Sequence, residues 1–364
     1  MSSSPSSSYG KGSSSSTSKT KTTAKTSTRN TETGKIIPSK RSSPYDANFE
    51  QNLIQVKTYQ YGYEYPDGSV PPLAGNYEET HRGLAQCRSS LSPSRFSNGV
   101  RQKFLQKDAK ARNEQDVRME VLPALLDAMG ASGGAQKDIL FTNINSLTNS
   151  VTQAKPDYYY GAQPEQLDPG VYEELSSHIA PRPSLPIAPN LFLEAKGPAG
   201  STVVGLRQAC HDGAIGARAI HSLQTYRQKT PVYDNNIYTI SSTYHAGQLK
   251  MYGHSAAQPN GPGTQPEYYM HQLNAYSMTG DQEIFLKGAT AFKNAMDLTK
   301  EYRNTAIARA NEIAARPAED DEEVDEENEE EEEEEGADDA NDDVALPSFA
   351  HRNTNASTLK AKRP

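Results

Sequence analysis

The stretch Leu191-Phe192-Leu193-Glu194-Ala195-Lys196 decides the fold of this chain, because an apolar run ends in an acid and a lysine two residues apart. Side chains of a β-strand alternate between the two faces of a sheet. Phe192, Glu194 and Lys196 are therefore expected on one face, and the two leucines and Ala195 on the other. The spacing predicts a core strand whose end holds a carboxylate and an ammonium side by side.

A second acid precedes another β-prone stretch upstream. Asp157 follows Pro156 and is followed by Tyr158, Tyr159 and Tyr160. An acid on one strand and an acid-x-lysine on the next is the arrangement that metal-dependent cleavage of a phosphodiester needs. A hard divalent cation there would neutralise charge on the phosphoryl group and activate a water molecule.

The residue types fit distinct roles at such a site. Asp157 and Glu194 would supply carboxylates to Mg²⁺ or Mn²⁺, and the carbonyl of Ala195 could add a third oxygen. Lys196 would hold the attacking water or stabilise the developing negative charge, as a compact ammonium can. These three side chains are the predicted catalytic centre.

The rest of the chain between residues 101 and 316 reads as alternating helices and strands. A first helix is expected over about 101–129, with Pro123 kinking or breaking it. A helix over about 202–226, capped by Ser201 or Thr202, is expected after the Glu194 strand. The other expected elements are a strand from Ile139-Leu140-Phe141, a short helix at Tyr172–Ile179 within a Pro-rich insertion, a hairpin of Tyr238–Tyr244 with Leu249–Tyr252, and helices near 267–277 and 281–314. This order predicts a single α/β or α+β domain, with a mixed sheet flanked by helices.

The two ends differ in composition from the centre. Residues 1–45 are rich in Ser, Thr and Lys, and residues 317–364 hold an acidic run with a short basic end. Neither segment has enough apolar surface to offset its ordering entropy, so both are predicted to be disordered. Residues 46–100, rich in Tyr and Pro, are predicted to form an irregular arm that wraps the core.

Charge is divided unevenly along the chain. Residues 319–343 contain 19 Asp and Glu and no Lys or Arg. The remaining 27 acids face 37 Lys and Arg, a balance of +10, which predicts a basic body with an acidic tail. A basic body favours a nucleic-acid partner.

Several classes of protein are disfavoured. Two cysteines cannot build a disulfide framework or a four-cysteine zinc site, and the eight histidines show no ligand spacing. Cys210, on an apolar helix stripe, is expected to be a small buried residue. No apolar stretch is long enough to span a membrane or to act as a secretory signal, so an intracellular location in the nucleus or cytoplasm is expected.

The order Asp157, then Glu194-x-Lys196, then a helix resembles the PD-(D/E)xK nuclease superfamily, also called restriction-endonuclease-like. Segments 192–198, 206–210 and 266–270 look more narrowly like a fungal PD-(D/E)xK nuclease-like family. The resemblance covers roughly residues 100–300 and implies a restriction-endonuclease-like core.

The resemblance implies two further site residues. Glu114, in the first helix, matches an acid that often completes the metal site of these nucleases. Gln208 matches a polar residue that in some branches contacts the lysine, the metal-bound water or DNA. His211, three residues later, is expected on the same helix face.

Two functions remain open from the sequence. The first is a Mg²⁺-dependent nuclease, acting on DNA rather than RNA. The second is a catalytically inactive nuclease-like scaffold whose acidic tail binds basic proteins such as histones. An enzyme requires Asp157, Glu194 and Lys196 to meet in one place, whereas a scaffold does not.

Overall fold

A computed structural model describes residues 41–94, 96–259 and 265–316, and it contains one seven-stranded mixed sheet in the order β1-β7-β6-β5-β4-β3-β2. The strands are β1 (Thr58–Tyr59), β2 (Gln136–Lys137), β3 (Tyr158–Ala162), β4 (Ile187–Lys196), β5 (Ile237–His245), β6 (Gln248–Ala257) and β7 (Glu267–Ser277). The longer helices are α1 (Phe49–Gln55), α2 (Tyr77–Ala85), α3 (Asn98–Lys110), α5 (Leu122–Ala128), α6 (Pro169–Ile179), α7 (Thr202–Gln224) and α8 (Gln282–Ala315). The predicted α/β class, with a mixed sheet flanked by helices, is confirmed.

The sheet is antiparallel except at two places. β4 runs parallel to β5, and β1 runs parallel to β7. The parallel register aligns Glu194 with Thr243 and Lys196 with His245, so the carboxyl ends of β4 and β5 meet at one edge. The predicted hairpin is confirmed, because β5 turns into β6 through Ala246 and Gly247, both at positive φ.

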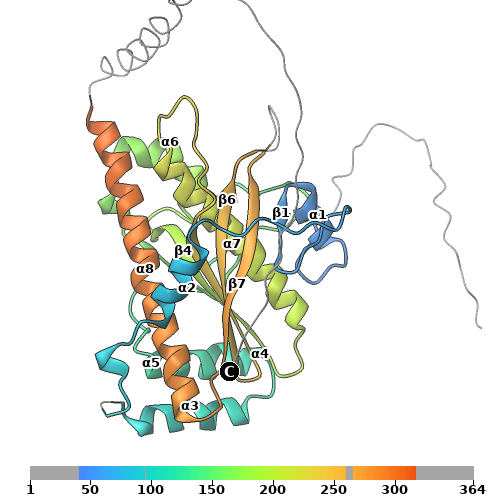
Figure 1. Cartoon of the computed structure of the whole chain (residues 1–364), viewed down its shortest axis with the longest axis vertical. Helices are drawn as coiled ribbons and strands as arrows, with labels where there is room; N and C mark the ends of the chain where they lie inside the picture. The colour runs from blue at the N-terminus through green and yellow to red at the C-terminus, as the bar shows by residue number, and fades with distance from the viewer. Residues whose placement is uncertain (1–40, 95, 260–264, 317–364) are drawn as a thin grey trace, which may run out of the picture. The chain divides into compact units, whose positions relative to one another are not determined.

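The two faces of β4 bury different partners, as the alternation predicted. Leu191, Leu193 and Ala195 join the largest apolar cluster, whose other members include residues of α3, α5 and α8. Phe192, on the opposite face, packs with Ile215 of α7. Figure 1 shows α8 along one side of the sheet and α1 with β1 at the other.

The helix α7 matches its prediction closely. The hydroxyl of Ser201 accepts a hydrogen bond from the amide of Val204 and caps the helix. At Gly216, an added Cβ would lie 2.7 Å from Thr239 and 2.8 Å from Phe192, so only glycine permits this approach of helix and sheet. The small residues of α7 therefore set how deeply it packs on β4 and β5.

The predicted first helix is broken, but not at Pro123. It divides at residues 111–113 into α3 and a second segment, which starts with α4 (Glu114–Asp116), continues as a π-helical turn (Val117–Val121) and ends as α5. Pro123 lies in the first turn of α5, directly after the π-turn. The wider turn accommodates the missing amide and the bulk of the proline ring within a continuous helix.

Two other predicted elements are wrong. Residues 139–141 form no strand: Asp138 has a φ of 56°, which ends β2 after two residues, and Phe141 instead packs against Tyr159. The predicted helix near 267–277 is the strand β7. Leu273 is a bulge, because Gln272 pairs with Tyr252 and Asn274 with Met251, and this shift gives the apolar residues a helix-like spacing.

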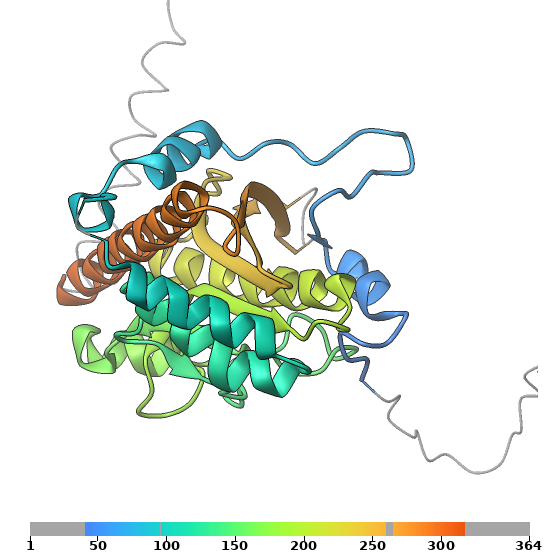
Figure 2. The ribbon, with the colours of Figure 1, turned by 90° about the horizontal axis from the view of Figure 1, so that it is seen from below.

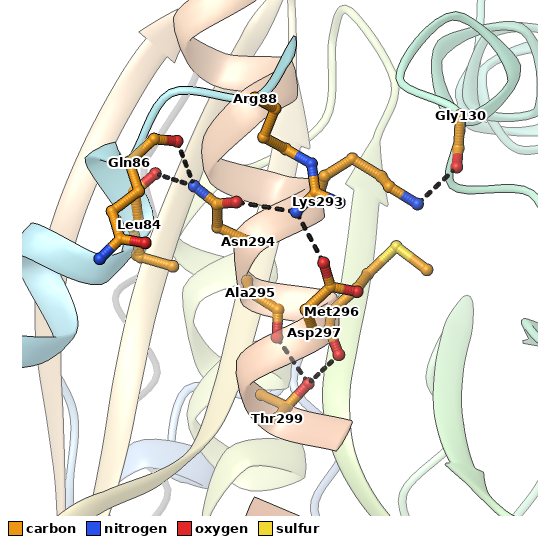
Figure 3. Close-up of polar contacts among 10 residues, drawn as sticks. All are labelled: Leu84, Gln86, Arg88, Gly130, Lys293, Asn294, Ala295, Met296, Asp297 and Thr299. Carbon is orange, nitrogen blue, oxygen red and sulfur yellow. Dashed lines mark hydrogen bonds and ion pairs between the residues drawn. The ribbon is translucent and has the colours of Figure 1, made fainter. Parts of the chain in front are cut away.

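The arm of residues 46–100 contains more regular structure than predicted and packs on the core. β1 adds to the edge of the sheet, and α2 lies against α8 (Figure 2). The side-chain amide of Asn294 on α8 donates to the backbone carbonyls of Leu84 and Gln86 (Figure 3). Arg88 forms an ion pair with Asp297 at 2.6 Å (Figure 3). These polar contacts fix the end of α2 on α8.

The predicted short helix at Tyr172–Ile179 is present and begins earlier, as α6, because Asp168 caps it. The predicted helix near 281–314 is α8, capped by Asp281. Within the described ranges, no helix combines the length and the apolar character needed to cross a membrane. The predictions of disorder for residues 1–45 and 317–364 lie outside the described residues except at 41–45. There the prediction is wrong, because Ser42 forms a bridge with Val151 through backbone hydrogen bonds.

Candidate functional site

Two hydrogen bonds from backbone amides to side-chain carboxylates hold Asp157 and Glu194 side by side. Asp157 immediately precedes β3, and its amide donates to Oε1 of Glu194 at 3.0 Å. In return, the amide of Ala195 donates to Oδ2 of Asp157 at 2.8 Å. Asp157 is 7% exposed and Glu194 is fully buried. The two predicted acids are thus brought together at the start of one strand and the end of its neighbour.

Lys196 completes this group two residues further along β4. Its side chain is 3% exposed, and its Nζ donates to Oε1 of Glu114 at 3.0 Å. Burial alone would lower the pKa of Lys196, but the charge of Glu194 and the hydrogen bond to Glu114 outweigh it and raise the pKa. The ammonium is therefore charged at neutral pH. Glu114 from α4 reaches the group by pairing with Lys196, and the metal-site role that the resemblance implied for Glu114 stays a prediction.

Asp212 is a member of the site that the sequence analysis missed. It lies on α7, is 2% exposed, and its carboxylate interacts electrostatically with that of Glu194. Burial raises the pKa of Asp212 to about 7, and the charge of Asp157 acts in the same direction. The sequence did contain a signal for Asp212. It is an acid between Cys210 and Gly213, within the apolar stripe of a predicted helix. We refer to Asp157, Glu194, Lys196, Asp212 and Glu114 as the acid–lysine cluster.

Two carboxyl groups of the acid–lysine cluster each have an oxygen without a hydrogen-bond partner in the described structure. Burial raises the pKa of Glu194 well above its ordinary value, and the charges of Asp157 and Asp212 raise it further. Within the described part of the chain, Oε2 of Glu194 and Oδ2 of Asp212 have no hydrogen-bond partner. Two orphaned oxygens on adjacent buried acids are polar atoms that a cation or a shared proton would satisfy.

Arg118 occupies the outer side of Asp157. Its Nε lies 2.6 Å from Oδ1 of Asp157, and it also pairs with Asp138. Burial raises the pKa of Asp157, although the amide of Ala195 and the charge of Arg118 oppose that rise. No group of three or more His, Cys, Asp or Glu side chains able to hold a metal ion is found among the described residues. A cation at this site would therefore be held by one or two carboxylates and by water, which is how Mg²⁺ is commonly bound.

Gln208 lies on the same face of α7 as the cluster. Gly205 packs against the side chain of Lys196, and Asp212 contacts Glu194, so Gln208 lies between them at helical spacing. Its Oε1 is buried without a hydrogen-bond partner in the described structure. Among the described residues, no hydrogen bond joins Gln208 to the acids. The predicted role of Gln208 stays a prediction.

His211, three residues after Gln208, contacts α1. Its ring packs edge-on against Phe49 of α1, with centroids 5.7 Å apart. Burial lowers the pKa of His211 to about 4, and the charge of Arg218 contributes. α1 therefore covers the part of α7 that carries His211, and the prediction that His211 shares a face with Gln208 stays a prediction. Cys210, 1% exposed, is the small buried residue that was predicted.

A cavity of about 240 Å³ opens beside Lys196 at the edge where β4 and β5 end. Its walls come from three elements: the start of α7, the end of β5 and the start of β6. They include Thr202, Gly205, His245 and Lys250. Two lysines, Lys196 and Lys250, therefore line the cavity beside the start of α7.

The predicted basic body is wrong for the described core. Residues 41–316 contain 26 Lys and Arg and 26 Asp and Glu, so this part of the chain is neutral. The excess of positive charge lies in residues 1–40, with seven Lys and Arg and one Glu, and in residues 344–364, with four Lys and Arg. Attraction of nucleic acid by net charge would therefore depend on these ends.

Comparison with known proteins places the acid–lysine cluster within a segment that matches one family. Among curated proteins no match to the chain is found. Residues 100–310, more than half of the chain, match the family described as "Domain of unknown function (DUF7924)". This range includes all five residues of the cluster and excludes the arm. The chain belongs to the DUF7924 family.

Proposed function

We propose that this domain is a Mg²⁺- or Mn²⁺-dependent nuclease that hydrolyses phosphodiester bonds, with DNA as its substrate. The observation that carries the proposal is the convergence of Asp157, Glu194 and Lys196. The amide of Asp157 donates to the carboxylate of Glu194, the amide of Ala195 donates to the carboxylate of Asp157, and Lys196 follows Glu194 on the same face of β4. Such a buried group of opposite charges has no packing role that apolar residues would not fill better.

The roles follow from where each group lies. Asp157 and Glu194 would hold the cation, with the carbonyl of Ala195 as a further oxygen, and the bound cation would supply charge neutralisation at the phosphate. Lys196 stays charged and would hold the attacking water as its oxygen bonds to phosphorus and the bond to the leaving oxygen breaks. Glu114 orients Lys196 by accepting from its Nζ at 3.0 Å.

The unpaired carboxyl oxygens support a cation at this place. Glu194 and Asp212 are buried acids whose charged forms are mutually unfavourable, and each retains an oxygen without a partner within the described ranges. Mg²⁺ commonly binds through one or two carboxylates and keeps several waters. Glu194 and Asp212 therefore fit a hydrated divalent cation better than a closed four-ligand zinc site.

The cavity beside Lys196 supports a phosphate-bearing substrate. Lys250 and His245 line it together with the first turn of α7. These groups donate hydrogen bonds or carry positive charge, as phosphate recognition requires. Because the described core is neutral, we expect binding to depend on these local groups and on the basic first forty residues.

A second function is favoured by one contact. Arg118 already neutralises Asp157 at 2.6 Å, and the described residues contain no closed group of metal ligands. A domain that keeps the fold while an arginine replaces the cation would be an inactive scaffold. In that case the acidic run of residues 319–343 would supply the function, by binding basic proteins such as histones.

The deciding experiment is cleavage of labelled single-stranded and duplex DNA and of RNA, with and without Mg²⁺ or Mn²⁺. Glu194→Gln and Lys196→Gln should each abolish metal-dependent cleavage, while circular dichroism shows a folded protein. The matched controls are Glu283→Gln and Lys287→Gln, an exposed pair on α8 with side chains 77% and 64% exposed. Metal-dependent cleavage that survives both cluster variants, or no cleavage by the wild type under any condition, would reject the nuclease and leave the scaffold.

A further inference from the structure

A segment from outside the family domain lies over the acid–lysine cluster. Residues 41–48, which we call the strap, precede α1. Ser42 pairs with Val151 in a parallel bridge: its amide donates to the carbonyl of Ser150, and its carbonyl accepts from the amide of Thr152, each at 2.8 Å. The upstream end of the strap is therefore fixed by backbone hydrogen bonds.

The downstream part of the strap is fixed by α7 and α1. Arg207 of α7 donates to the carbonyls of Pro44 and Asp46, each at 3.3 Å. Phe49, three residues after Asp46, is fully buried in the core. Both neighbours of Tyr45 are thus held by the helix whose first turn borders Lys196.

Tyr45 is placed over Lys196 but is not buried by it. The Nζ of Lys196 lies 5.7 Å from the centroid of the Tyr45 ring, within range of a cation–π contact. The residue is nevertheless 65% exposed, among the highest values of the large apolar and aromatic residues in the described structure. A tyrosine held this firmly, yet left open to solvent beside a buried lysine, presents a ring surface at the mouth of the site.

We infer that Tyr45 stacks on an unpaired base next to the phosphate that is cleaved, so that the substrate is single-stranded nucleic acid or a frayed strand end. This inference rests on the proposed nuclease function and names the substrate form for the same site. Tyr45 acts as a positioning residue, because its ring holds the neighbouring nucleotide while Lys196 and the acids act on the phosphate.

Two features of the site indicate that the base stacked on Tyr45 is unpaired. The ring can stack only on a base whose face is free, and the interior bases of a duplex have both faces covered by their neighbours. Lys196 is 2% exposed and borders a cavity of about 240 Å³, at the small end of ligand pockets. A single strand can bring one phosphate into such a recess, whereas an intact duplex has to open first.

The chain offers a direct spectroscopic test, because it contains no tryptophan. Tyr45→Trp creates a single fluorophore at the proposed stacking position. Val232→Trp is the matched control: Val232 is 70% exposed and its carbonyl contacts His221, near the far end of α7. Each variant is titrated, in EDTA to prevent cleavage, with an oligonucleotide of about 12 nucleotides and with the blunt duplex of the same sequence.

Saturable quenching of Tyr45→Trp by the single strand, with little by the duplex and none in Val232→Trp, is the expected result. In cleavage assays, Tyr45→Ala should raise KM roughly tenfold with kcat nearly unchanged, because base stacking on an aromatic ring is lost. Tyr45→Phe keeps the ring and should retain the wild-type KM. The thermal unfolding temperatures of the wild type, Tyr45→Ala and Tyr45→Phe should be the same, because Tyr45 is mostly exposed.

Three results overturn the inference: no quenching of Tyr45→Trp by the single strand, equal affinity for the duplex, or faster cleavage by Tyr45→Ala. The last would make Tyr45 a cover that blocks Lys196. Wild-type cleavage separates this inference from the proposed function. Cleavage without quenching rejects the stacking role alone, whereas quenching without cleavage keeps the contact with nucleic acid and rejects the nuclease.

Discussion

Replacing Asp212 by asparagine should make the protein more stable at alkaline pH. The side chain is 2% exposed and lies beside the buried acid Glu194, and burial raises its pKa from 3.8 to about 7. In the unfolded chain the carboxyl releases its proton near pH 4, and in the folded protein near pH 7. Between these pH values the unfolded state binds fewer protons, so the free energy of unfolding falls as the pH rises.

The size of the effect follows from the same shift. One pKa unit corresponds to 1.36 kcal/mol, so the ionisation of Asp212 lowers the free energy of unfolding by about 3 kcal/mol between pH 5 and pH 8. Asparagine has the same shape and no titrating proton, and its amide can still donate to Glu194. Relative to the wild type, Asp212→Asn should therefore gain about 3 kcal/mol over this range.

Urea denaturation followed by circular dichroism, at pH 5 and pH 8 in EDTA, measures this difference. Asp127→Asn, at an exposed position on α5, is the matched control and should follow the wild type at both pH values. If Asp212→Asn is less stable than the wild type at pH 8, the carboxylate is a required structural acceptor. The description of the cluster as mutually repulsive acids would then be wrong.

Three further outcomes are expected. Burial lowers the pKa of His254 to about 3, so protonation of this histidine in the unfolded chain should lower the free energy of unfolding by about 2.3 kcal/mol between pH 6.5 and pH 4.5. In urea denaturation, His254→Gln should lose about that much less stability than the wild type over this range. Gly213→Ala should cost about 2 kcal/mol or more, because an added Cβ would overlap the ring of His254, whereas Gly83→Ala in α2 meets no atom within 4 Å and should stabilise by about 0.5–1 kcal/mol. Lys196→Arg should lose metal-dependent cleavage and also lower stability by about 1–3 kcal/mol, since Lys196 packs against Gly205 and leaves little space for a guanidinium. An arginine variant with wild-type cleavage would assign Lys196 a purely electrostatic role.

The parts of the fold that the sequence predicted well are those set by local chemistry. Strand alternation placed Glu194 and Lys196 on one face, and Ser201 marked the start of α7. β7 could not be recognised in this way. Its bulge at Leu273 exists because β6 pairs with it in two registers, and the choice of register depends on the partner strand.

The same limit explains which site residues were found. Asp157 and Glu194 occur beside β-prone runs, so their pairing followed from strand order. Asp212 and Arg118 reach the cluster from two separate helices, and the packing of those helices on the sheet determines the contact. A buried acid among small helix residues was visible in the sequence, but its partner Glu194 became known only from the fold.

The pairing of β1 with β7 has a consequence for the order in which the protein is made. Thr58 pairs with Tyr268, and Phe49 packs with Met270, so the arm leaves the ribosome early but its docking surface is synthesised near the end of the domain. Contacts between segments so distant in sequence form slowly. The strap instead contacts segments that are made earlier, at Val151 and Arg207, so Tyr45 can reach Lys196 before β1 docks on β7. A partly folded chain would then have the acid–lysine cluster and Tyr45 together while the edge of the sheet at β7 is still unpaired.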